Sequence, residues 1–256
     1  MAIKLKRPKQ IAALRESGRL VAQTHALIKE AIRPGVRLSS LDKLAADYLA
    51  ENGAKPLYLG YRGNPPTHPP FPGVICASVN EEVCHGLPDD RVLRNGDIVA
   101  IDIGLLYNGW CGDACVTYGV GQISPRAKRL MDVTQECLRR GIAAAQPGRR
   151  LSDIGAAIQV YAEGLGYGVV REWGGHGLGR DLHEEPSVQH VGPPGNGPVI
   201  RPGMVFTIEP MINEGTERWH LLDDGWTVVT ADGKLSAQFE HTIAITRNGP
   251  IILSLP

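Results

Sequence analysis

The fold is decided by residues 99–113, V-A-I-D-I-G-L-L-Y-N-G-W-C-G-D. Two apolar, strand-like runs flank the Asn-Gly pair at 108–109. Asn-Gly is the strongest short signal for a β-hairpin, because a type I′ turn needs positive φ at both central residues. Such a turn pairs Gly104 with Asp113, so Asp102 lies on the same face as Asp113, as its diagonal neighbour. Provided that no bulge shifts the register, the sequence predicts two carboxylates within reach of one point.

Two carboxylates at that spacing need a reason to lie inside an apolar hairpin. Unit charges about 4 Å apart repel by about 4 kcal/mol at an effective dielectric constant of about 20. Either one carboxyl group keeps its proton, as in an acid–base dyad, or cations allow both to ionise. Alternatively, the two carboxylates do not meet, because one aspartate lies in the strand and the other in a solvated turn. The hairpin alone leaves both interpretations open.

The composition limits the classes of protein to consider. The chain has 256 residues and a mass of 27.6 kDa, with 43% hydrophobic residues and a formal net charge of zero. This length suits one large domain or two small ones, and we expect a single domain over residues 1–256. A neutral chain argues against specific nucleic-acid binding and against a membrane surface, although basic residues cluster between residues 4 and 9.

The cysteine pattern indicates a reducing compartment. Five cysteines occur and none forms a C-x-x-C pair, so neither a disulfide framework nor a cysteine-ligated zinc site is expected. The N-terminus also lacks the apolar core of a signal peptide, and no apolar run is long enough to span a membrane. We therefore expect a cytoplasmic protein.

Two pairs of helices are predicted. In the first pair, apolar residues over 11–28 approximate a 3.6-residue period, and a second helix with Ser39 or Ser40 as N-cap closes at Gly53. The second pair begins with Ser124 as N-cap and proline at the first helical position. Each pair is joined by a similar segment, P-G-V-R-L-S in the first and P-G-R-R-L-S in the second.

A second match extends this internal repeat to the strands. L-R-N-G-D-I-V-A-I-D at 93–102 parallels I-R-P-G-M-V-F-T-I-E at 200–209, at nearly the same separation as the first match. We therefore expect two related halves packed about a pseudo-twofold axis, with Asp102 and Glu209 at equivalent positions. The halves cover about residues 8–121 and 122–254, and the first contains an extra Pro-rich loop at 64–70.

Three further motifs carry candidate ligands. They are W-G-G-H-G-L-G-R-D-L-H-E-E-P with His176, F-T-I-E-P with Glu209, and A-Q-F-E-H-T-I-A-I-T with Glu240. The first is not a dinucleotide fingerprint, because Arg180 occupies the last glycine position, and no G-x-S-x-G serine-hydrolase motif occurs. Each buried acid could instead pair with an arginine, but four acids and one histidine in such contexts favour metal. This hard, oxygen-rich set suits two divalent ions such as Mn²⁺, Fe²⁺, Co²⁺ or Zn²⁺, which activate water and polarise a carbonyl.

The ordered motifs resemble the type I methionine aminopeptidases. The resemblance rests on C-H-G-L-P, G-G-H-G-L-G, L-H-E-E-P, T-I-E-P and Q-F-E-H-T, and it runs from about residue 8 to 254. The short interval between His176 and Glu209 leaves no room for the long helical insertion of type II enzymes. The resemblance implies an α+β "pita-bread" fold, in which a curved antiparallel sheet is flanked by two helix pairs in pseudo-symmetric halves.

The resemblance also implies roles for the site residues. Asp113 and Glu240 would bridge two metal ions, Asp102 would complete one site, and His176 and Glu209 would complete the other. Glu209 would also take a proton from the attacking, metal-bound water. Two loop histidines would contact the substrate, with the second at the scissile carbonyl and the developing oxyanion. These histidines are His85 and His183, and the expected walls of the methionine pocket are Tyr61, Phe71, Cys76 and Trp226.

Gly104 departs from the family pattern. Many relatives have threonine there, so one hydrogen bond near the metal-binding acids is expected to be missing.

The expected activity is removal of the initiator methionine from nascent polypeptides when the second residue is small, by a monomer with possible ribosome contacts. An X-Pro aminopeptidase or prolidase shares the five ligands but carries a further N-terminal domain. A metal-free binding protein on the same fold would have lost ligands, whereas all five are present here.

Overall fold

The computed structural model describes residues 2–63 and 66–256, so residues 64–65 of the Pro-rich loop lie outside the described residues. The helices are α1 (Pro8–Ala31), α2 (Leu38–Glu51), α3 (Pro125–Ala144) and α4 (Ser152–Gly164). The strands of the first half are β1 (Lys55–Pro56), β2 (Cys76–Val79), β3 (Glu82–Cys84), β4 (Ile98–Tyr107) and β5 (Trp110–Gly119). Those of the second half are β6 (Gly168–Val169), β7 (Gly175–Gly177), β8 (Glu184–Val188), β9 (Val205–Ile208), β10 (Met211–Asn213), β11 (Trp219–Leu221), β12 (Val228–Thr230), β13 (Ser236–Gln238), β14 (His241–Thr246) and β15 (Gly249–Ile252).

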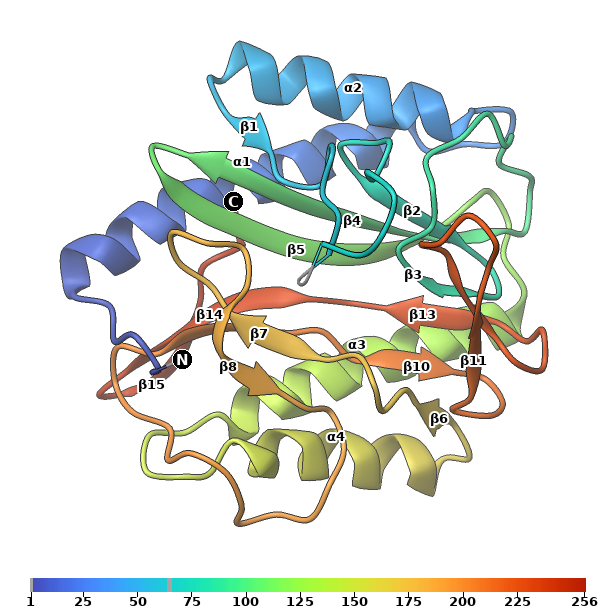
Figure 1. Cartoon of the computed structure of the whole chain (residues 1–256). Coiled ribbons are helices and arrows are strands. Elements are labelled where there is room, and N and C mark those ends of the chain that lie inside the picture. Colours follow the sequence, from blue (N-terminus) through green and yellow to red (C-terminus); the bar gives the residue numbers. More distant parts are fainter. Residues whose placement is uncertain (1, 64–65) are drawn as a thin grey trace.

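The strands form a central layer between two pairs of helices. In Figure 1, α1 and α2 cover one side of this layer and α3 and α4 cover the other. Every strand pairing among the described residues is antiparallel, including β4 with β5 and β14 with β9. The predicted α+β architecture, with strands flanked by two helix pairs, is confirmed.

The internal repeat is visible in the backbone contacts. A β-bridge joins Arg37 to Val92 in the first half, and an equivalent β-bridge joins Arg150 to Val199 in the second. These bridges hold the segment before α2 against the loop that leads into β4, and the segment before α4 against the loop that leads into β9. A left-handed glycine recurs in both turns, as Gly35 with φ of 92° and Gly148 with φ of 90°.

One helix start was predicted correctly and one was not. The Ser124 hydroxyl accepts a hydrogen bond from the Ala127 N–H and caps α3 as expected. The prediction of Ser39 or Ser40 as the N-cap of α2 was wrong. The helix begins at Leu38, because the β-bridge to Val92 holds Arg37 in an extended conformation. The Ser39 hydroxyl donates to the Asp90 carboxylate instead of capping the helix.

The two halves meet along β5. An isolated bridge pairs Val116 of β5 with Phe239, and the Glu240 N–H donates to the Cys115 carbonyl over 2.8 Å. This backbone pairing lies in the interval between β13 and β14, so Glu240 is held beside β5 rather than within a regular strand. The seam therefore brings an acid of the second half next to Asp113 of the first.

Two large apolar cores lie under the helix pairs, and smaller apolar clusters join residues of both halves, such as Trp110 with Leu178. The core under α3 and α4 contains Phe206, Ile208 and Ile243, whereas the core under α1 and α2 contains Val99 and Ile101. Within the part of the chain that the structure describes, no helix is long and apolar enough to cross a membrane. Each helix pair thus uses its apolar face to cover mainly the strands of its own half, although Leu14 of α1 also packs with Val205 and Ala244 of the second half.

Close packing of α1 on β5 predicts a sensitive glycine. A Cβ at Gly112 would lie 2.7 Å from the backbone of Ser17, whereas a Cβ at Gly164 would meet no described atom within 4 Å beyond its chain neighbours and the nearby backbone of α4. We expect Gly112→Ala to lower the free energy of unfolding by about 1–3 kcal/mol through overpacking. The control Gly164→Ala is expected to be neutral or slightly stabilising. Urea denaturation of both variants checks this, and equal midpoints would contradict it.

Candidate active site

The predicted hairpin is present with the predicted register. Gly104 of β4 pairs with Asp113 of β5, and the turn residues Asn108 and Gly109 have φ of 50° and 74°. No bulge interrupts the ladder between β4 and β5. Asp102 therefore shares a face with Asp113, which is only 2% exposed.

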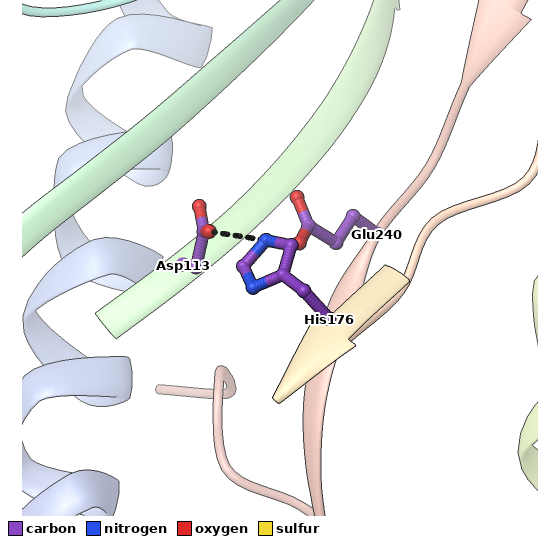
Figure 2. Close-up of side chains that lie close together, drawn as sticks. All are labelled: Asp113, His176 and Glu240. Atoms are coloured by element: carbon purple, nitrogen blue, oxygen red, sulfur yellow. Dashed lines mark ion pairs between the residues drawn. The ribbon is translucent and has the colours of Figure 1, made fainter. Parts of the chain in front are cut away.

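A histidine and an acid from the second half join Asp113. Figure 2 shows Asp113, His176 and Glu240 pointing toward one another from β5, from β7 and from the segment before β14. Their ligand atoms lie within 4.8 Å of one another, and His176 Nε2 is 3.5 Å from Asp113 Oδ2. Residues far apart in sequence thus converge on one buried point.

The orientation of His176 is set by its own strand. Its Nδ1 lies 3.2 Å from the Gly177 carbonyl, which can only accept a hydrogen bond, so the ring proton is assigned to Nδ1 and the lone pair to Nε2. Burial lowers the pKa of His176 to about 3, and the ring is neutral at neutral pH. The flanking glycines are needed for packing, because a Cβ at Gly175 would lie 2.2 Å from the Thr207 carbonyl oxygen.

Glu209 follows directly after β9, and the side chains of Thr207 and Gln238 donate to its carboxylate. The Thr207 hydroxyl donates to Oε1 over 2.7 Å, and the Gln238 amide donates to Oε2 over 3.4 Å. The same Thr207 hydroxyl accepts from the His176 N–H, so it connects the two residues. Burial raises the pKa of Glu209 to about 8.

The four acids cannot all ionise in this enclosure without compensation. Burial raises the pKa of Asp102 to about 6, and burial together with the neighbouring acids raises the pKa of Asp113 and Glu240 well above their ordinary values. Glu240 Oε1 is buried and has no hydrogen-bond partner among the described residues. Four crowded acids, one of them with an unpartnered carboxylate oxygen, and a neutral imidazole form a donor set that fits a divalent cation.

One of the two loop histidines, His183, lies directly against this cluster. The His183 ring packs against the His176 ring at 4.3 Å between centroids, and its Nδ1 lies 3.1 Å from the Tyr61 hydroxyl. His85 packs edge-on against Trp173 at 5.1 Å. Burial lowers the pKa of His85 to about 4 and also lowers that of His183. Both rings are therefore neutral at neutral pH.

The structure also gathers the expected pocket walls. Phe71, Cys76 and Trp226 form one buried apolar cluster, and Tyr61 packs against its edge. A cavity of about 350 Å³ opens beside it and is lined by Tyr61 and His183. The described part of the Pro-rich loop packs here too, because the Trp226 indole N–H donates to the Pro69 carbonyl over 2.9 Å.

Sequence reasoning did not find the polar residues that support the ligands. Tyr58 was not singled out, yet its hydroxyl lies 2.7 Å from Asp102 Oδ1 and 2.9 Å from Asp113 Oδ1. The hydrogen bond expected to be missing at Gly104 is thus supplied from the facing loop. Thr207 could have been found, since it precedes Glu209 by two residues and shares its face, whereas the position of Tyr58 depends on loop geometry that no sequence period encodes.

Comparisons with known proteins show the family to which the chain belongs. The model of metallopeptidase family M24 matches residues 12–247, so the fold and the acid-rich site define a metallopeptidase. Methionine aminopeptidase 1 of Bacillus subtilis is 50% identical over 97% of this chain and 98% of its own length. The crystal structure of the methionine aminopeptidase from Rickettsia prowazekii superposes with a TM-score of 0.95 at 44% identity, covering 99% of this chain and all of that one. The chain therefore belongs to family M24, in its methionine aminopeptidase branch.

The rival peptidases share the fold at lower identity. Prolidase from Pyrococcus furiosus superposes with a TM-score of 0.79 at 22% identity, covering 98% of this chain and 65% of the prolidase chain. At this identity the likeness shows the fold alone. The relatives at high identity that match over nearly their full length are methionine aminopeptidases, which favours this branch over the prolidases.

The raised acid pKa values predict how cations and pH act together. Between about pH 6.5 and about pH 8, Glu209 binds a proton in the folded metal-free protein, with a pKa of about 8, but not in the unfolded chain. The folded state therefore loses stability as pH rises through this window. The buried histidines have the opposite effect, but only below their ordinary pKa of about 6.5. Because bound cations need ionised ligands, we expect Mn²⁺ to raise Tm more at pH 8 than at pH 6.5.

Differential scanning calorimetry with chelator and with Mn²⁺ at both pH values measures this difference. An Mn²⁺-induced rise in Tm that is equal at the two pH values, or larger at pH 6.5, would contradict the assignment of the acids as cation ligands.

Proposed function

We propose that the chain removes the N-terminal methionine of proteins whose second residue is small, as one catalytic unit spanning both halves. The single observation that carries the proposal is the convergence of Asp113, His176 and Glu240 beside an apolar cluster. The names of the relatives support the substrate. We further propose that the protein acts as a monomer in the cytoplasm on nascent chains, with contacts at the ribosome.

The metal ligands are assigned as the family pattern implies. Asp113 and Glu240 would contact two divalent ions, Asp102 would contact one of them, and His176 and Glu209 would contact the other. When bound, such ions supply a Lewis acid for the substrate carbonyl and lower the pKa of water. Mn²⁺, Fe²⁺, Co²⁺ and Zn²⁺ all suit this donor set. Two ions would also satisfy the Glu240 oxygen that has no hydrogen-bond partner among the described residues.

Glu209 is assigned as the general base. The donors Thr207 and Gln238 fix its carboxylate at the edge of the cluster. Its pKa of about 8 without cations falls when positive charge is added nearby, so it is ionised and able to accept a proton at neutral pH. The position of Glu209 beside the cluster and the lowering of its pKa by cations support its assignment as the general base.

The two loop histidines are assigned to the substrate. Tyr61 can donate to His183 Nδ1, which leaves the proton of the neutral ring on Nε2 and available to the oxygen of the scissile carbonyl. His85 is also neutral, and its ring packs edge-on against Trp226 at 6.2 Å between centroids. The methionine side chain is assigned to the buried cluster of Phe71, Cys76 and Trp226, where apolar surface and aromatic rings suit a thioether.

Removing a metal ligand is expected to abolish turnover without unfolding the chain. We expect Asp102→Ala and Glu240→Ala to lower kcat/KM on Met-Ala-Ser by at least about 10³-fold, because each leaves the cations under-coordinated. The control Lys43→Ala, at an exposed ion pair on α2, should retain full activity. Circular dichroism checks folding, and near wild-type activity in either ligand variant would overturn the metal assignment. Cleavage of Ala-Pro-Ala in place of Met-Ala-Ser would indicate the prolidase activity instead.

A further inference from the structure

Tyr58 contacts the carboxylates of both acids of the hairpin through its hydroxyl. Its hydroxyl is 2.7 Å from Asp102 Oδ1 and 2.9 Å from Asp113 Oδ1. Both distances are typical of hydrogen bonds between a hydroxyl and a carboxylate. A hydroxyl has one proton and two lone pairs, so it can donate to either carboxylate and accept from whichever carboxyl group is protonated.

The structure makes a specific space for this ring. A Cβ at Gly104 would lie 2.7 Å from Tyr58 Cε1 and 3.0 Å from the hydroxyl oxygen, so any side chain there would displace the ring. The backbone next to the ring is fixed as well, because the Leu57 N–H donates to the Gly104 carbonyl over 3.0 Å. Gly104 and Tyr58 therefore form a matched pair, in which the absence of a side chain on β4 admits the hydroxyl from the facing loop.

We propose that Tyr58 is a positioning residue for the metal site, whose hydroxyl donates to one of the ionised Asp102 and Asp113 carboxylates and holds it in the orientation that binds cations. The proposal rests on the proposed function, since it assigns cations to these acids. Tyr58 acts through the two acids and is not assigned contact with the cations or the substrate. Residues that hydrogen-bond to metal ligands and orient them typically contribute about 10- to 100-fold to metal affinity.

Removing only the hydroxyl tests this role. We expect Tyr58→Phe to weaken Mn²⁺ binding to the metal-free protein by about 10- to 100-fold in isothermal titration calorimetry. We also expect it to change the visible absorption spectrum of the Co²⁺-loaded protein, which reports ligand geometry. The matched control is Tyr118→Phe, which removes a hydroxyl hydrogen-bonded to His25 rather than to a carboxylate, and its Kd should stay within about twofold of wild type.

A second substitution tests the same contact independently. Gly104→Ala is compatible with the backbone, because Gly104 is not among the positive-φ glycines, but its Cβ must push the ring away. We expect Gly104→Ala to weaken Mn²⁺ binding in the wild-type background. Combined with Tyr58→Phe, it should add little further loss, because the hydroxyl that it displaces is already gone.

The proposal is overturned if Tyr58→Phe folds and binds Mn²⁺ with the wild-type Kd and an unchanged Co²⁺ spectrum. If Tyr58→Phe does not fold, Gly104→Ala decides, and wild-type metal affinity in that variant overturns the proposal. Fully additive losses in the double variant also contradict it. Failure of the proposed function is distinguishable, because in that case the wild-type protein itself would bind no Mn²⁺ and cleave no Met-Ala-Ser.

Discussion

Repulsion among the buried carboxylates is the constraint on which the rest of the structure depends. Asp102, Asp113, Glu209 and Glu240 lie in one enclosure, and burial raises the pKa of each. Protons can relieve this crowding in the metal-free protein, but at neutral pH divalent cations relieve it while keeping the acids ionised. The cost of burying the acids is therefore also the source of the affinity for cations.

The pseudo-symmetric fold is what brings the acids together. Each half contributes a helix pair that covers its own strands, so the polar site can form where the halves meet (Figure 1). The bridge between β5 and Phe239 sets the register at this seam. Polar groups such as Thr207 and Tyr58 then orient individual carboxylates, while glycines such as Gly104 and Gly175 allow the close approach of neighbouring groups.

Much of this arrangement could be predicted from the sequence. The Asn-Gly turn determines which residues of the hairpin face each other, and the repeated P-G and strand motifs determine how the halves correspond. These signals are local or periodic, so a single sequence contains them. The N-cap of α2 was misplaced because a long-range bridge to Val92 decides where the helix begins. Tyr58 was missed for a related reason, since its approach to the acids depends on the empty space above Gly104.

The most direct test of the central claim is the number of protons released when cations bind. Isothermal titration calorimetry of the metal-free protein with Mn²⁺, at about pH 7 in buffers of different ionisation enthalpy, measures this number. If cations replace protons on the crowded acids, each protein molecule should release at least about one proton on saturation, and Glu240→Gln should lower that number. Saturation with Mn²⁺ without proton release would contradict the account.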